Sequence, residues 1–130
     1  MNKLVQVVGP VNAPGVSSKR TAGGPAPVHA NLSMFASILN PTSSLTHTIS
    51  PTTKKAYLHL IMRSGYRAPS VSAAEKYEDG GAKLRVNGGL ILEEGDGAFV
   101  DLGAVTDSRE IKVENVGEKR DAEWLLFEME

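Results

Sequence analysis

The side chains best suited to chemistry in this sequence are two histidines, His47 and His59. Each falls in the middle of a segment with the alternation of a β-strand, and we expect the two strands to be neighbours. Two inward-pointing imidazoles could bind a metal ion or hold a ligand in the mouth of a barrel. A mononuclear metal site needs three or four ligands, and Glu93 and Glu94 are the carboxylates that could complete one. With so few partners, a hydrogen bond within the fold explains each histidine better. We therefore predict no metal and no cofactor.

Acid–base chemistry is a second hypothesis for the same part of the chain. Tyr57 and His59, with Arg63 and Tyr66 just beyond, gather around one strand end. They could line a pocket that binds an aromatic or acidic small molecule. His47, His59 and Tyr57 are then the candidate catalytic residues. The competing interpretation of Arg63 and Tyr66 is a solvated loop, since loops commonly carry such side chains.

Three other motifs carry weaker signals. The segment 17–20 and the following Gly23-Gly24 have the composition of an anion-binding loop, but they lack the Gly-Lys-Ser/Thr ending and the helix that such loops need. Asp96 could be a metal ligand, but it is better explained as a turn residue whose side chain bonds backbone amides. Trp124 and Phe127 could form a partner-binding patch, and core packing is the alternative that we favour.

Composition excludes several classes of protein. Lys and Arg number 14 against 15 Asp and Glu, for a formal charge of -1, so no broad basic face is available for direct contact with nucleic acid. We expect no membrane span and no leader, because no apolar run has the required length. Cysteine is absent, which excludes disulfides and a cysteine nucleophile and favours a cytoplasmic location. With 130 residues, 41% of them hydrophobic, we expect one domain spanning 1–130.

The pattern of apolar residues predicts the strands that must position these side chains. The predicted strands are Leu4–Val8, Asn31–Leu39, Leu45–Ile49, Ala56–Met62, Glu110–Val116 and Glu123–Met129, with two or three short strands within Leu84–Leu102. A long loop is predicted at Val11–Pro27, and at most one short helix at Ser70–Tyr77. The strands at 56–62 and 123–129 are apolar at almost every position, so we expect both faces of each to be covered.

Turn chemistry joins these strands into an all-β fold. Gly95-Asp96-Gly97 separates the apolar runs Leu90–Leu92 and Ala98–Val100, which is the layout of strand, tight turn and strand. Glycine supplies the positive φ that such a turn requires. Many short strands with few helices indicate a sandwich or barrel, and a jelly roll pairs nearly every strand. We therefore predict a jelly-roll barrel of antiparallel strands.

Several short motifs, taken in order, resemble a known family. They are Val5-Gln6-Val7-Val8-Gly9, Pro27 before the strand Asn31–Leu39, Leu45-Thr46-His47-Thr48-Ile49, Ala56-Tyr57-Leu58-His59-Leu60, Leu92-Glu93-Glu94-Gly95-Asp96-Gly97-Ala98 and Ala122-Glu123-Trp124-Leu125-Leu126-Phe127. Over nearly the whole chain this order resembles the C-terminal domain of the pirin family, within the cupin superfamily. The resemblance implies a double-stranded β-helix, which is the jelly-roll barrel of cupins.

The same resemblance implies what this chain lacks. Pirins bind iron in their N-terminal domain through a His-x-His pair, a further histidine and a glutamate. This chain has only His29, His47 and His59 and contains no His-x-His pair. None of the family's metal ligands can therefore be assigned to a position here, and the dioxygenase activity that depends on that metal is not expected.

Two functions follow as hypotheses. The first is a pirin-like cupin domain without the metal-binding motif, acting as a non-catalytic binding module. It would form a homodimer or pair with a partner barrel, because this half of a pirin packs on another barrel. The alternative is a small cupin enzyme, an isomerase, lyase or oxygenase, that acts on a small organic molecule, such as a secondary metabolite, inside the barrel. A nuclear role as a transcriptional cofactor, which some pirins have, fits the near-neutral charge poorly.

Overall fold

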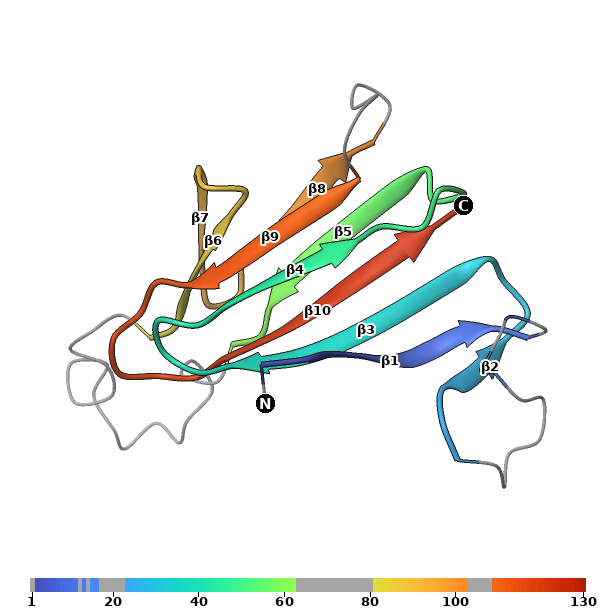
Figure 1. The fold of residues 1–130 in the computed structure, drawn as a ribbon, viewed down its shortest axis with the longest axis horizontal. Helices are drawn as coiled ribbons and strands as arrows, with labels where there is room; N and C mark the ends of the chain where they lie inside the picture. Colours follow the sequence, from blue (N-terminus) through green and yellow to red (C-terminus); the bar gives the residue numbers. More distant parts are fainter. Residues whose placement is uncertain (1, 12, 14, 17–22, 63–80, 103–108) are drawn as a thin grey trace, which may run out of the picture.

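The protein is built from β-strands, and no helix occurs in the parts of the chain that the structure describes. In the computed structural model these parts are residues 2–11, 13, 15–16, 23–62, 81–102 and 109–130 (Figure 1). The strands are β1 (Leu4–Pro10), β2 (Ala26–Val28), β3 (Leu32–Leu39), β4 (Ser44–Thr48), β5 (Lys55–Leu60), β6 (Lys83–Val86), β7 (Leu90–Glu93), β8 (Gly97–Asp101), β9 (Glu110–Asn115) and β10 (Ala122–Met129). Across the same ranges, no helix has the length and hydropathy to cross a membrane. The short helix predicted at Ser70–Tyr77 lies outside the described residues.

The strands form two sheets. The larger sheet has six strands in the order β2-β1-β3-β10-β5-β8, and the smaller has four in the order β4-β9-β6-β7. Figure 1 shows β1, β3, β10 and β5 side by side. Paired strands are antiparallel, except that β1 and β2 are parallel. The predicted all-β jelly roll is confirmed, with that one parallel pair as the exception.

The core lies between the two sheets, because successive side chains of a strand point to opposite faces. On β10, Ala122, Trp124, Leu126 and Glu128 are buried, whereas the residues between them are half-buried. The largest fully buried apolar side chains are Leu39, Ile49, Leu58, Leu60, Leu84, Ile111, Val113, Trp124 and Leu126. They come from both sheets and form one cluster. Leucine, isoleucine and tryptophan side chains therefore fill the interior of the described sandwich.

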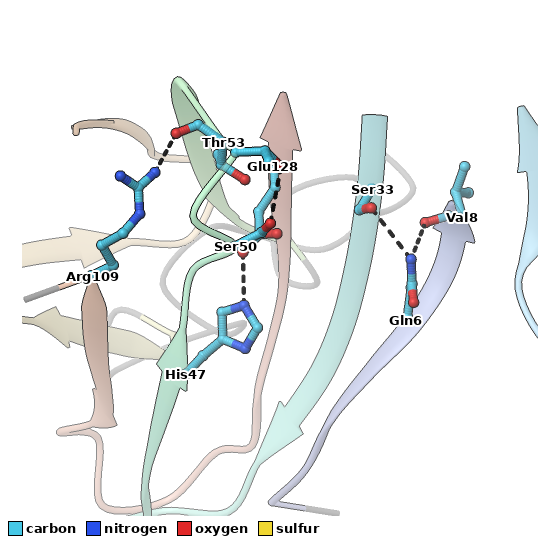
Figure 2. A network of polar contacts seen from close by, with 9 residues as sticks. Gln6, Val8, Ser33, His47, Ser50, Thr53, Arg109 and Glu128 are labelled. Carbon is cyan, nitrogen blue, oxygen red and sulfur yellow. Dashed lines mark hydrogen bonds and ion pairs between the residues drawn. The ribbon is translucent and has the colours of Figure 1, made fainter. Parts of the chain in front are cut away.

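The first strand and the segment after it differ from the prediction. β1 continues through Gly9 to Pro10, and β2 occupies the end of the predicted loop and pairs with β1. A three-residue strand is too short to show a periodic pattern, which explains why the sequence did not reveal it. Between Gln6 and Val8 the register against β3 shifts, as in a β-bulge. The Gln6 amide donates to the carbonyl oxygen of Val8 at 3.4 Å and to the hydroxyl of Ser33 at 3.3 Å (Figure 2).

The outer face of the smaller sheet is polar and charged. Glu114 on β9 accepts a hydrogen bond from Arg85 Nε at 2.8 Å, and its other oxygen lies 3.1 Å from Lys112 Nζ. These hydrogen bonds, from Arg85 first and then Lys112, lower the pKa of the Glu114 carboxyl. Because the register places Thr46 opposite Lys112 and Lys83 opposite Glu93, hydroxyl and charged groups continue across the sheet. This face has the composition of a surface in contact with water.

The outer face of the larger sheet is apolar instead, and we call it the open face. By register, its outward side chains are Val5, Val8, Leu32, Met34, Ala36, Ile38, Tyr57, His59, Phe99, Leu125, Phe127 and Met129, with Lys55 and Glu123 among them. The smaller sheet packs on the opposite side, so no described strand covers this face. Phe99 is 75% exposed and Val5 is 56% exposed. On β5 and β10 the outward residues are half-buried, apart from the exposed Lys55, and the expectation that both faces of these strands are covered is not met within the described residues.

Leu126→Ala should lower the free energy of unfolding by about 2–5 kcal/mol, because it leaves a cavity in a fully buried part of the core. The matched control is Leu90→Ala. Leu90 is 52% exposed on β7, and its truncation should change stability by less than about 0.5 kcal/mol. Urea denaturation measures both variants. Equal losses would contradict the assignment of Leu126 to the inward face.

Candidate functional site

His47 lies on the inward side of β4 and bridges the two sheets. Its Nε2 atom is 2.8 Å from Oε1 of Glu128 on β10, and the side chains are 19% and 6% exposed. Figure 2 shows the imidazole directed at that carboxylate. The ring also packs on Phe35, with the ring centroids 5.0 Å apart. Because a buried carboxylate without a partner is costly, the imidazole has a structural role as the donor that Glu128 requires.

Tyr57 and His59 form a separate group on the open face. Both lie on β5, and the Tyr57 hydroxyl is 3.2 Å from His59 Nδ1. The Tyr57 ring contacts two other aromatic rings, with centroid distances of 5.0 Å to Phe99 and 6.1 Å to Phe127. A Cβ on Gly97 would overlap the Tyr57 hydroxyl, so glycine at this position leaves room for the tyrosine to lie across β8. The result is an aromatic cluster at the surface rather than a pocket inside the barrel.

The prediction that the strands of His47 and His59 are neighbours is wrong. β4 belongs to the smaller sheet and pairs with β9, whereas β5 belongs to the larger sheet between β10 and β8. His47 points into the sandwich, and His59 points out of the opposite sheet. The turn between β4 and β5 therefore carries the chain from one sheet to the other. The two imidazoles do not share a site, and the three candidate acid–base residues are not brought together.

The remaining candidates have structural contacts or fall outside the described ranges. Asp96 is a turn residue as predicted: its carboxylate accepts the Glu93 amide at 3.0 Å, beside Gly95 with φ of 90°. The Glu94 carboxylate accepts the backbone amide of Ala82 at 3.0 Å. Among the residues that the structure describes, no group of three or more His, Cys, Asp or Glu could hold a metal ion.

Two of the proposed ligand-binding residues, Arg63 and Tyr66, lie outside the described residues. Sequence reasoning also missed two features of the site. One is the buried carboxylate of Glu128, whose signal was its position in an apolar strand with only one other acidic residue, Glu123. The other is the open face, whose signal was the run of outward apolar residues on neighbouring strands.

His47→Ala should lower the free energy of unfolding by about 1–3 kcal/mol near neutral pH, because it leaves the Glu128 carboxylate buried without its donor. Replacing both partners in the double variant His47→Leu and Glu128→Leu should recover most of that loss, since no polar group is then left unpaired. Chemical denaturation measures the free energy of unfolding of the unchanged chain, of His47→Ala and of the double variant. The control is His29→Ala at an exposed position, which should leave stability unchanged. No recovery in the double variant would contradict this role.

Comparison with known proteins gives a likeness of fold. No protein-family model matches the sequence, and no curated protein matches it. Among solved structures, YhhW from Escherichia coli matches 100% of this chain with a TM-score of 0.61 and 15% sequence identity. The structure of that bacterial pirin in complex with nickel(II) matches 98% of the chain with a TM-score of 0.62 and 15% identity.

The match covers only part of YhhW. The chain spans 39% of the length of YhhW in both structures. At 15% identity the likeness concerns the fold, which is the pirin and cupin fold that the sequence motifs suggested. The nickel ion belongs to the YhhW complex, and its presence there assigns no ligand to a residue of this chain.

Proposed function

We propose that this chain is a pirin-like cupin domain that acts as a non-catalytic binding module, and that its partner is a second copy of itself. The observation that carries this proposal is the open face of the six-stranded sheet. Apolar patches on single soluble proteins seldom exceed a few hundred square ångströms, and larger ones mark interaction sites. The contrast with the charged outer face of the smaller sheet supports a specific surface rather than a generally apolar protein.

The size of the open face fits a dimer. The six strands have between three and eight residues each, which at about 3.4 Å per residue and about 4.8 Å between strands gives a face of about 600 Å². A standard stable interface buries about 800 Å² on each partner. Two such faces in contact would therefore come close to the area that a stable dimer needs.

The charges on the open face favour a second copy as the occupant. Glu123 stands at the first end of β10, and Lys55 is paired with Met129 at the last end. If a two-fold axis lies between the two faces and perpendicular to the strands, the strands of the second copy run in the opposite direction to those of the first. Its Glu123 carboxylate would then lie near the Lys55 ammonium of the first copy, and the reverse pair forms by symmetry. Lys3 lines the same hollow as Glu123, so each copy would bring cations and a carboxylate to this contact, and the Glu123–Lys55 pairs would favour this register.

The aromatic cluster is the expected hot spot of binding on this face. Tyr57, Phe99 and Phe127 are in mutual contact through Tyr57, and aromatic residues are enriched among the side chains that dominate binding. The described interior supports a non-catalytic role, since apolar side chains and the His47–Glu128 pair occupy the space between the sheets. We therefore assign Tyr57 and His59 to recognition rather than to acid–base chemistry.

Phe99→Asp should dissociate the dimer, because it places a carboxylate in the apolar contact at a position that is 75% exposed and can change without unfolding the chain. Val5→Asp tests the opposite side of the same face, where Val5 is 56% exposed. Sedimentation velocity at micromolar concentration should show a dimer for the unchanged chain and a monomer for either variant.

The matched control is Ile91→Asp on the outer face of the smaller sheet, where Ile91 is 46% exposed. This variant should remain a dimer. A monomeric unchanged chain would overturn the proposal and leave a different protein as the occupant. Dissociation by Ile91→Asp, with Phe99→Asp still dimeric, would place the interface on the other sheet and also overturn it.

A further inference from the structure

A cleft lies at the end of the sandwich that carries the turn between β4 and β5. It has a volume of about 570 Å³ and is lined by Pro51, Thr52, Thr53, Lys54, Leu102, Arg109 and Glu130. The lining combines one guanidinium, one ammonium and two hydroxyl groups with a single carboxylate side chain. The cleft therefore has more positive than negative side-chain charge.

The Arg109 guanidinium is the unusual group in this cleft. One of its Nη atoms donates to the carbonyl oxygen of Thr53, as Figure 2 shows. Its Nε atom is buried and has no hydrogen-bond partner among the described residues. No carboxylate in that part of the chain pairs with it, whereas Arg85 is paired with Glu114. A buried donor of this kind costs stability unless an ion or water satisfies it.

The groups around Arg109 suit an anion better than a cation. Thr53 is 4% exposed, so its position is fixed by the fold. Lys54 is exposed at the mouth of the cleft, and its backbone amide is held by the carbonyl oxygen of Met129 at 2.9 Å. Among the lining residues the one opposing side chain is Glu130, whose carboxylate accepts a hydrogen bond from the Thr52 hydroxyl. The two cations outnumber this one carboxylate, so an anion in the cleft would meet a net positive side-chain charge.

We propose that this cleft binds a small oxyanion, a phosphate or carboxylate group, held by Arg109 and Lys54. A guanidinium presents several donors in one plane, which matches the oxygens of phosphate and carboxylate, and an ammonium adds a mobile charge. None of the lining residues is among the outward side chains of the open face, so the proposal does not depend on the dimer.

The test is a titration of the protein with inorganic phosphate, followed by backbone amide signals in nuclear magnetic resonance. Saturable shifts at Thr53, Lys54 and Arg109 are expected. Arg109→Met should weaken phosphate affinity by about ten- to a hundredfold, which is the effect of losing a hydrogen bond to a charged group. The control Arg85→Met removes a surface arginine outside the cleft and should leave the affinity unchanged. A parallel titration with acetate distinguishes carboxylate from phosphate as the preferred anion.

A second variant keeps the proposal testable if Arg109→Met does not fold. Lys54→Met changes an exposed side chain and should weaken phosphate affinity severalfold. The absence of saturable shifts with both anions would overturn the proposal. Equal weakening by Arg109→Met and Arg85→Met would also overturn it, since binding would then follow net charge rather than the cleft. Sedimentation in phosphate and in its absence separates this result from the dimer proposal, because anion binding should leave the association state unchanged.

Discussion

The pairing of β10 between β3 and β5 is the constraint on which the rest of the structure depends. All eight residues of β10 pair with β3, and six of them also pair with β5. Since side chains alternate along a strand, a shift of one residue would exchange the two faces of β10. Leu126 would then lie outside and Phe127 inside. His47 can contact Glu128 across the sandwich only in the observed register of β10, so this polar pair depends on the same register.

The register also separates the two outer surfaces. The residues of β10 that point away from the core join those of β3 and β5 to form a continuous apolar surface. The smaller sheet contains the same kind of alternation, but its outward residues are mostly polar or charged, with Ile91 as an apolar exception, and Arg85 and Glu114 are paired with each other. The outer face of the smaller sheet thus suits contact with water, and the outer face of the larger sheet is the surface that we propose for a partner. The asymmetry comes from which residues point outward, since side chains alternate between the two faces in both sheets.

The sequence predicted the positions of the strands better than their pairing within the two sheets, for a physical reason. Periodicity is local, so it identified the strands around Phe35, His59 and Trp124 and the turn at Asp96. Which sheet a strand joins depends on contacts between distant segments, and no local pattern records them. The separation of His47 from His59 and the bond of His47 to Glu128, which is 81 positions away, are both of this kind. Trp124 and Phe127 are a different case, because local alternation was enough to separate them, and the core packing that we favoured for both holds for Trp124 but not for Phe127. They lie three positions apart in one apolar strand, so alternation places them on opposite faces, with one in the core and one on the open face.

The edges of the larger sheet explain why its face, rather than its rim, is suited to association. An unpaired edge strand can recruit further strands without limit, and proteins protect against this with short edges and proline. One edge here is β2, which has three residues and includes Pro27, a residue without an amide hydrogen to donate. The other edge is β8, which has five residues. Pairing through a face about a two-fold axis uses the same patch on both copies and leaves nothing open for a third. In the dimer that we propose, short edges and one apolar face would favour a closed pair over an open chain of molecules, because a single partner can cover the whole apolar face.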